Sequence, residues 1–316
     1  MTAEYRHTPV MLAQCREALA LQAGEIACDA TLGGAGHSLV LAQDLEPRGL
    51  LIGVDRDPAA LAVARKRMLN QHPHLRFIAL QGNFAELDDL LLEARVPGVD
   101  AFLFDLGVSS PQLDLPERGF SYARSAPLDM RMNPGEHTPT AAEIINTINE
   151  QDLTWVLRTY GEERWAARIA QHIVRARAKQ ALQTTDELAQ IIREAIPARF
   201  RRSGGNPAKR SFQALRIMVN GEMDALHKGL EAAIRWLNPA GRIAVISYHS
   251  LEDRIVKELF ARMALGCICP PQAPICTCGQ TPILSSVSRR PQTPTSEEVE
   301  ANPRAASAKM RWAIKR

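Results

Sequence analysis

Long apolar runs are missing from this 316-residue sequence, and none approaches the roughly 18 residues that span a bilayer. Residues 1–6 lack the apolar core of a signal peptide, and no segment repeats. We therefore expect a cytoplasmic protein with no membrane partner. With 46% hydrophobic and 23% charged residues, the composition is that of a globular protein, and the length allows an α/β core with an additional subdomain.

Apolar runs and helical patterns alternate through the first hundred residues. Short apolar runs are typical of buried parallel strands, and the patterns between them are typical of covering helices. The expected strands are 26–30, 50–54, 75–80 and 99–104, with helices at about 37–46, 58–71 and 84–94. This alternation predicts a doubly wound, Rossmann-like α/β sheet that binds its ligand at the carboxyl ends of the strands.

The alternation stops after the fourth strand. Residues 105–139 are rich in loop residues, and helical patterns follow at 141–149, 151–160, 162–180 and 185–196. A long helix at 206–237 then leads into a strand at 242–248, a helix at 250–263 and a last strand at 309–314. Because about a hundred residues are too many for one crossover, we predict an inserted helical subdomain at 112–205 within a domain formed by 1–111 and 206–316.

The most informative segment is a glycine-dense turn between the first strand and the first helix, Asp29-Ala30-Thr31-Leu32-Gly33-Gly34-Ala35-Gly36-His37-Ser38. The second strand ends in Asp55, 22 residues after Gly33. Glycines allow the backbone to approach a nucleotide closely, and an acid at the next strand end can accept hydrogen bonds from both ribose hydroxyls. The turn lacks the G-x-G-x-x-G spacing, which favours S-adenosylmethionine over NAD as the cofactor. An ordinary strand-to-helix turn is the alternative.

Two further strand ends carry candidate site residues. Phe84 follows the third strand, where its ring would stack on an adenine; plain core packing is the alternative. Asp105 ends the fourth strand and precedes a polar loop, at the position that faces the reacting centre in a doubly wound sheet. The alternative for Asp105 is a helix cap or a loop anchor.

Net charge is only +3, but the basic residues are unevenly placed. Residues 157–216 contain 13 Lys/Arg and 5 Asp/Glu, a net +8, which leaves −5 for the rest. This excess is typical of a protein with a polyanionic partner, and solvated helix faces are the alternative that charge alone leaves open. The candidates for phosphate docking are Arg158, Arg164, Arg168, Arg175, Arg177, Lys179, Arg199, Arg201 and Arg202. Arginines and aromatics also gather around Arg118, Phe120 and Tyr122, which suits single-stranded RNA unless the cluster is structural.

Four of the six cysteines cluster as Cys267-Ile268-Cys269 and Cys276-Thr277-Cys278. Four neighbouring thiolates can form a tetrahedral zinc site. The one-residue gap within each pair is tighter than the usual spacing, and the segment between the pairs is rich in proline. The sequence therefore leaves zinc or reduced loop thiols open, and no metal ligand is assigned.

Nine motifs in order along the chain resemble the bacterial small-subunit ribosomal RNA (cytosine-N4)-methyltransferase family. They are His7–Leu12, Gly33–Ser38, Gly53–Pro58, Phe104–Asp114, Glu117–Tyr122, Pro127–Met132, Tyr160–Glu163, Arg210–Arg216 and Ser247–Arg254. The resemblance implies a methyltransferase sheet and cofactor contacts from Gly34, Ala35, Gly36, His37, Asp55, Phe84, Asp105 and Gln112. His37 and Gln112 rest on the resemblance alone. Ala35 stands where some members are expected to have glycine, which should shape the turn without abolishing binding.

The resemblance further implies methylation of a cytidine N4 amine in 16S rRNA, on the small subunit or an assembly intermediate. Such an amine is a poor nucleophile, so catalysis must position it against the methyl group. Many amino-methyltransferases do this with an Asn/Asp/Ser-Pro-Pro-aromatic loop, but this chain has Asp105-Leu106-Gly107-Val108 instead, so their mechanism cannot simply be copied. Our hypothesis is that Asp105 lies at the reaction centre and contacts the cofactor and the N4 amine. Methylation at C5 is disfavoured since no cysteine lies between Cys28 and Cys267, and ribose methylation since 105–135 contains no lysine.

His249, Arg254 and Arg118 are the candidates for holding the target nucleotide. The structural alternative for the first two is a helix start, with Ser250 as its N-cap. A small-molecule methyltransferase and a non-catalytic assembly factor are the rival functions, and the sequence does not decide between monomer and homodimer.

Overall fold

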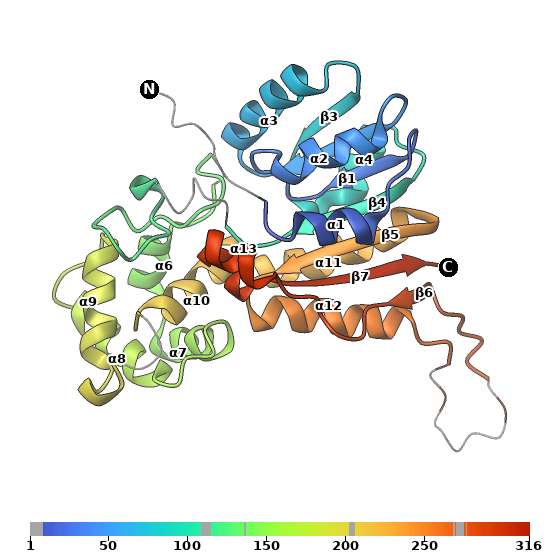
Figure 1. Ribbon diagram of the computed structural model, residues 1–316. Helices are drawn as coiled ribbons and strands as arrows, with labels where there is room; N and C mark the ends of the chain where they lie inside the picture. Colours follow the sequence, from blue (N-terminus) through green and yellow to red (C-terminus); the bar gives the residue numbers. More distant parts are fainter. Residues whose placement is uncertain are drawn as a thin grey trace. The chain divides into compact units, whose positions relative to one another are not determined.

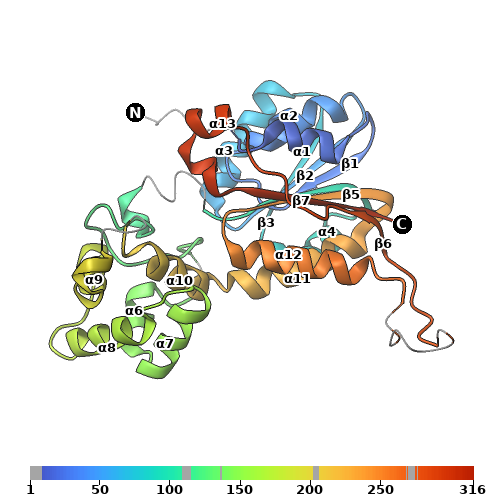
Figure 2. The same ribbon diagram turned by 60° about the horizontal axis from the view of Figure 1, so that its bottom comes forward.

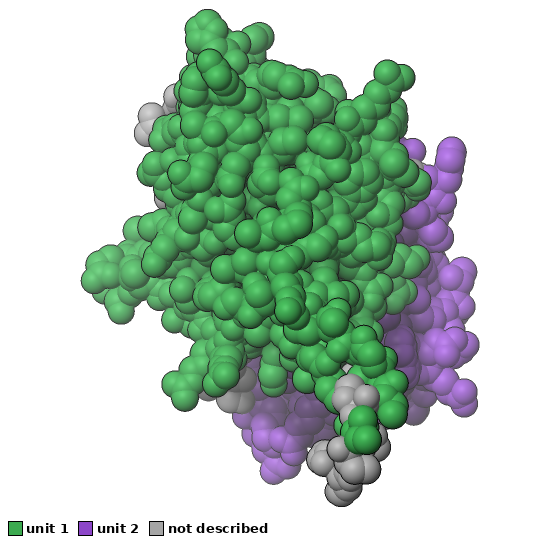
Figure 3. Space-filling model, turned by 90° about the vertical axis from the view of Figure 1, so that its right-hand side faces the viewer, with its two compact units in different colours: residues 1–107, 223–316 green, residues 108–222 purple. Residues whose placement is uncertain are grey.

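The computed structural model describes residues 9–108, 115–135, 137–201, 206–267, 269, 275 and 277–316. The chain divides into two compact units, residues 1–107 with 223–316 and residues 108–222. Figure 3 colours the first unit green and the second purple. Gln112, one of the expected cofactor contacts, lies outside the described residues.

Unit 1 is built on a seven-stranded sheet in the order β3-β2-β1-β4-β5-β7-β6 (Figure 1). Its first five strands are parallel, and β7 pairs antiparallel with both β5 and β6. The strands are β1 Ile26–Asp29, β2 Leu50–Asp55, β3 Arg76–Gln81, β4 Val99–Asp105, β5 Leu237–Ser247, β6 Leu284–Val287 and β7 Lys309–Lys315. The predicted doubly wound α/β sheet is confirmed. The edge strand β6 was not predicted.

Helices cover both faces of this sheet (Figures 1 and 2). One face packs against α1 Leu12–Leu19, α2 Gly36–Leu45 and α3 Pro58–Gln71, and the other against α4 Leu87–Glu93, α11 Glu222–Trp236 and α12 Ser250–Met263. Each layer has its own apolar core, with Leu51 and Leu103 facing one and Ile52 and Phe104 the other. Successive residues of a strand face opposite layers, and both layers are buried. This explains the continuous apolar runs of the strands. The short α13 Ser296–Ala301 follows β6.

Unit 2 is helical, as its sequence predicts. Its helices are α6 Ala141–Thr147, α7 Glu150–Thr159, α8 Ala166–Arg177, α9 Thr185–Ala195 and α10 Lys209–Asn220. Their apolar faces meet in a single core that includes Ile145, Leu157, Ile169 and Ile192. Each of these side chains is fully buried.

The helix predicted at 206–237 is two helices. Gly221 ends α10 with a φ of 59°, a left-handed conformation that glycine adopts readily, and α11 begins at the next residue. Phe212, Leu215 and Val219 of α10 lie in the unit 2 core. The predicted boundary at 205/206 is therefore wrong and lies instead after Glu222, while the first boundary falls at 107/108 rather than 111/112.

Candidate active site

Three carboxylates lie at one edge of the unit 1 sheet. Asp29, Asp55 and Asp105 are the last residues of β1, β2 and β4, which are neighbouring parallel strands. The strand order changes direction between β1 and β4. The carboxyl ends of strands at such a switch point border the usual ligand crevice of an open α/β sheet. The sequence-predicted Asp55 and Asp105 therefore lie at the same edge.

The glycine-dense turn connects β1 to α2 at this edge. Gly33 and Ala35 have φ values of 49° and 61°, so both are left-handed, and Ala35 directly precedes the helix. The backbone N–H of Leu32 donates to the carbonyl of Val54 at 2.9 Å, which ties the turn to β2. Alanine adopts this conformation less readily than glycine does. Ala35 is thus expected to influence the shape of the turn through its left-handed backbone conformation.

Asp55 fixes the turn through both carboxylate oxygens. Oδ2 accepts the backbone N–H of Gly33 at 2.7 Å, and Oδ1 accepts that of Asp57 at 2.8 Å. Burial raises the pKa of Asp55 to about 6, against the opposing effect of these two hydrogen bonds. Each carboxylate oxygen can accept a second hydrogen bond, so Asp55 can still receive two hydroxyls.

Asp29 and Thr31 hold the glycine-dense turn and the end of β4 through hydrogen bonds. Neither residue was singled out from the sequence. Asp29 is buried, and its Oδ2 accepts the hydroxyl of Ser38 at 2.7 Å. Burial raises the pKa of Asp29. The Thr31 hydroxyl oxygen accepts the backbone N–H of Asp105 at 2.6 Å, which joins the turn to the end of β4. Their polar side chains within the turn were the only available signal.

Asp105 is held by a residue that the sequence reasoning missed. The hydroxyl of Tyr248, just after β5, donates to Asp105 Oδ1 at 2.8 Å. Burial, together with the Asp105 charge, raises the pKa of Tyr248, so the phenol keeps its proton and remains a donor. The sequence shows the motif around His249, but it does not show the hydrogen bond between Tyr248 and Asp105. That contact depends on the register of β5 against β4.

His37 lies behind Asp105, with Nε2 3.5 Å from Asp105 Oδ2, and is almost fully buried. Burial disfavours the charged imidazole, but the Asp105 carboxylate and the Cys15 thiol outweigh it and raise the pKa of His37. Neither ring nitrogen makes a well-aligned hydrogen bond to any residue that the structure describes. A buried imidazole with unmet hydrogen-bonding capacity beside a strand-end carboxylate fits a position that a polar ligand completes.

Phe84 begins a short 3-10 helix after β3 and is half-buried. Its ring meets the ring of Phe104 edge-on, with centroids 5.7 Å apart. A Cβ on Gly229 would lie 2.7 Å from Phe84 Cδ2, so α11 packs directly against the ring. Core packing thus fixes the ring. Stacking on a cofactor adenine by its remaining surface stays a prediction.

His249 caps α12, although Ser250 was the expected cap. His249 has extended backbone, and its Nδ1 accepts the N–H of Glu252 at 3.4 Å. The Glu252 carboxylate accepts the backbone N–H groups of Tyr248 and His249 at 2.8 and 3.1 Å. His249 therefore has the structural role that was weighed for this motif. Arg254 is exposed on the first turns of the same helix.

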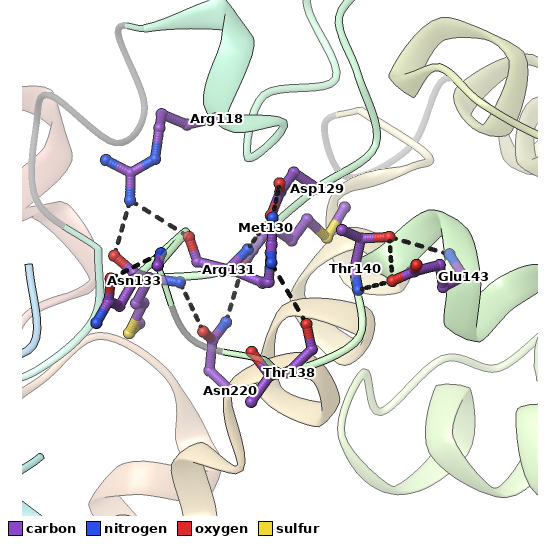
Figure 4. Close-up of polar contacts among 11 residues, drawn as sticks. Arg118, Asp129, Met130, Arg131, Asn133, Thr138, Thr140, Glu143 and Asn220 are labelled. Atoms are coloured by element: carbon purple, nitrogen blue, oxygen red, sulfur yellow. Dashed lines mark hydrogen bonds and ion pairs between the residues drawn. The ribbon is translucent and has the colours of Figure 1, made fainter.

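Arg118 lies in unit 2, in a loop network that Figure 4 shows in detail. Its Nη2 donates to the carbonyls of Met132 and Arg131 at 2.8 and 3.3 Å. Asn220 supports the same loop, because its side chain accepts the N–H of Met132 and donates to the carbonyl of Met130, each at 2.8 Å. These contacts give Arg118 a structural role, and its contact with substrate stays a prediction.

No helix in the described part of the chain is both long enough and apolar enough to cross a membrane.

The chain has close relatives along its whole length. It is 50% identical over 312 residues to the ribosomal RNA small subunit methyltransferase H of Heliobacterium modesticaldum, covering 98% of this chain and 99% of that one. Proteins of the same name from Geobacter sulfurreducens and Brevibacillus brevis are 50% and 47% identical over 314 and 315 residues, covering 98% and 99% of this chain and 99% of each relative. The pattern that defines the MraW methylase family matches residues 4–316. The chain belongs to the MraW methylase family.

Proposed function

We propose that this protein transfers a methyl group from S-adenosylmethionine to the N4 amine of a cytidine in the 16S rRNA of the small ribosomal subunit. The observation that carries the proposal is the Asp105 carboxylate, held by Tyr248 at the switch point beside the glycine-dense turn. Full-length similarity to proteins named as small-subunit rRNA methyltransferases supports the substrate class. Action in the cytoplasm follows from this substrate.

The cofactor is proposed to lie across the ends of β1, β2 and β4. Asp55 would accept the ribose hydroxyls, and the turn from Gly34 to Gly36 would let the backbone approach the cofactor closely. Phe84 would contact the adenine, while His37 and Gln112 remain contacts implied by the resemblance. When bound, the cofactor supplies an electrophilic methyl group on a sulfonium centre. A carboxylate such as Asp105 also favours that positive charge nearby.

The raised pKa of Asp55 makes cofactor binding sensitive to pH. As pH falls below about 6, the carboxyl gains a proton and loses acceptor capacity. The dissociation constant for S-adenosylmethionine should then rise by about tenfold per pH unit, and it should be flat above pH 7. Calorimetric titration between pH 5 and pH 8 measures this. An unchanged affinity at the acid end would contradict ribose binding by Asp55.

Asp105 would align the amine for in-line transfer. Its Oδ1 accepts the Tyr248 hydroxyl, and its Oδ2 lies 3.5 Å from His37 Nε2. Each carboxylate oxygen can accept a second hydrogen bond, and the side chain is 22% exposed, so Oδ2 could also accept a hydrogen from the cytosine N4 group. That hydrogen bond fixes the amine and directs nitrogen electron density toward the methyl carbon. When the amine is methylated, Asp105 Oδ2 or solvent would take up the proton that N4 loses.

Unit 2 supplies the proposed RNA-docking surface, and the structure divides its predicted basic residues into two groups. Exposed are Arg158, Arg164, Arg168, Arg175, Lys179 and Arg199. Arg177 and Arg201 instead bond helix-end carbonyls, those of Ile145 at 2.5 Å and Ile196 at 2.8 Å. Arg202 lies outside the described residues. The docking proposal is therefore reduced to the six exposed side chains.

Aromatic rings lie among these charges. Arg164 lies over the rings of Trp165 and Phe200, each 5.4 Å from the centroid, and Arg199 lies 4.7 Å from that of Phe200. Trp155 is 54% exposed. Guanidinium groups, and exposed rings such as that of Trp155, are groups that bind phosphates and unpaired bases. This composition favours an RNA substrate over a small molecule.

Binding to small subunits should depend steeply on salt. If about six phosphates are contacted, raising salt from about 50 to 200 mM should weaken binding by about 10²-fold or more. The double variant Arg168→Gln/Arg175→Gln should show a shallower salt dependence. The control Arg48→Gln/Lys66→Gln removes two exposed charges from unit 1 and should match wild type. Equal slopes for all three proteins, measured by filter binding, would argue against docking through unit 2.

The decisive experiment is transfer of a tritiated methyl group from S-adenosylmethionine to small subunits, followed by digestion of the RNA to nucleosides. Label in N4-methylcytidine, or its 2′-O-methylated form, is the expected result. Label in another nucleoside would contradict cytidine N4 as the target but would still support S-adenosylmethionine as the cofactor. Absence of label, with cofactor binding intact, would favour the assembly-factor function.

A further inference from the structure

We infer that Cys267, Cys269 and Cys278 are ligands of a structural zinc ion. The three sulfur atoms lie within 4.8 Å of one another, in the segment between α12 and β6. This site lies outside the proposed methyl-transfer machinery and does not rest on the proposed function. The fourth cysteine of the sequence cluster, Cys276, lies outside the described residues and is not assigned as a ligand.

The distance between two of the sulfurs matches tetrahedral coordination. Zinc–sulfur bonds are about 2.3 Å, and the sulfurs of a regular tetrahedron with such bonds are about 3.8 Å apart. Cys278 Sγ and Cys267 Sγ are 3.8 Å apart. A disulfide would need about 2.05 Å, so this pair is placed for a shared ion rather than for a covalent bond.

Backbone hydrogen bonding further suits thiolate ligands. The N–H of Cys269 donates to Cys267 Sγ at 3.4 Å. Such a bond stabilises negative charge on sulfur, and it arises because the two cysteines are separated by one residue. The tight spacing that made the sequence signal ambiguous therefore has a physical use. It brings the backbone donor of one ligand to the sulfur of the other.

The base of the segment is closed independently of the cysteines. Ile283 donates its N–H to the carbonyl of Met263 at 2.9 Å, and Gln280 Nε2 donates to the carbonyl of Leu265 at 3.4 Å. In Figure 1, the described ends of the segment leave α12 and return to β6 side by side. This base brings Cys267 and Cys278 together from opposite sides of the loop. The site is thus assembled by the fold and not by one local turn.

The described apolar residues of the segment bury little surface. Leu265, Ile275 and Ile283 are 49%, 74% and 44% exposed, so these three side chains are not collected into a core. Segments that bury little apolar surface are commonly stabilised by a metal ion or a disulfide. A zinc ion bridging residues 267 and 278 would cross-link the loop above its hydrogen-bonded base.

Zinc content of the full chain, purified under reducing conditions from zinc-supplemented medium, tests the inference. Wild type should carry about one zinc per chain, and Cys267→Ser, Cys269→Ser and Cys278→Ser should each carry about a tenth of that or less. The matched control Thr277→Ala alters the same loop without removing a thiol and should keep its zinc. Methyl transfer should be unaffected in all four variants, because these residues do not touch the Asp105 site.

Cobalt substitution and hydrogen exchange give two further measurements of the same site. Cobalt bound in place of zinc should give the intense visible bands of a tetrahedral thiolate site, and residues 264–283 should exchange amide hydrogens faster in Cys267→Ser/Cys278→Ser than in wild type. Zinc retained by that double variant would overturn the inference. Wild type that takes up no zinc on reconstitution, or that holds iron and sulfide in its place, would overturn it as well.

Discussion

Asp105→Asn is expected to slow single-turnover methyl transfer by about 10²- to 10³-fold. The asparagine oxygen can keep the hydrogen bond from the Tyr248 hydroxyl, which now measures 2.8 Å. The amide nitrogen then takes the place of Oδ2 and presents hydrogens instead of lone pairs. A cytosine amine can no longer donate to this atom. The substitution therefore leaves the shape of the site nearly unchanged, but it removes the acceptor for the amine and the carboxylate charge beside His37.

Asp100→Asn is the matched control, because it makes the same substitution at the other end of the same strand. Asp100 accepts the N–H of Ile26 at 2.8 Å and the Asn238 side chain at 2.7 Å, away from the proposed site. Its variant should transfer methyl groups at close to the wild-type rate. Rapid mixing with excess enzyme and cofactor isolates the transfer step. A full rate for Asp105→Asn would remove Asp105 from the reacting centre.

The sheet could be predicted because its strands are buried on both faces. Continuous apolar runs such as 50–54 and 99–104 identify such strands without knowledge of their neighbours. The edge strand β6 has only Leu284 fully buried among its four residues, so it carries no comparable run. The break at Gly221 was missed because helical spacing continues on both sides of one residue with positive φ.

The sequence predicts only those site residues whose location follows from their place at the end of a strand. The positions of Asp55 and Asp105 at one edge of the sheet could be predicted because parallel strands end at the same edge, while their contacts with cofactor and substrate stay predictions. Tyr248 and Thr31 act through contacts across strands, with Asp105 as the shared partner, and a single sequence does not specify such pairings. The same limit applies to Arg177, whose charge suggested RNA while its contact is the carbonyl of Ile145.

Asp55→Ala should weaken binding of S-adenosylmethionine by about 10²-fold. Two hydrogen bonds from ribose hydroxyls to a charged group are together worth about 3 kcal/mol, and each 1.4 kcal/mol is a factor of ten. The free energy of unfolding of the cofactor-free protein should change little. Loss of the bonds from Gly33 and Asp57 is offset because a carboxylate whose pKa is raised to about 6 no longer has to be charged in a buried position.

Asp57→Asn is the control for replacing a neighbouring carboxylate that is not expected to touch the ribose. Asp57 caps α3 by accepting the N–H of Ala59 at 2.9 Å, and asparagine caps helices equally well. This variant, two residues from Asp55, should bind the cofactor with wild-type affinity. Calorimetry on all three proteins, with thermal unfolding alongside, gives the comparison. If Asp55→Ala bound the cofactor normally, the buried charge at the end of β2 would have no function in binding, and its raised pKa would reflect only the folding of the turn around it.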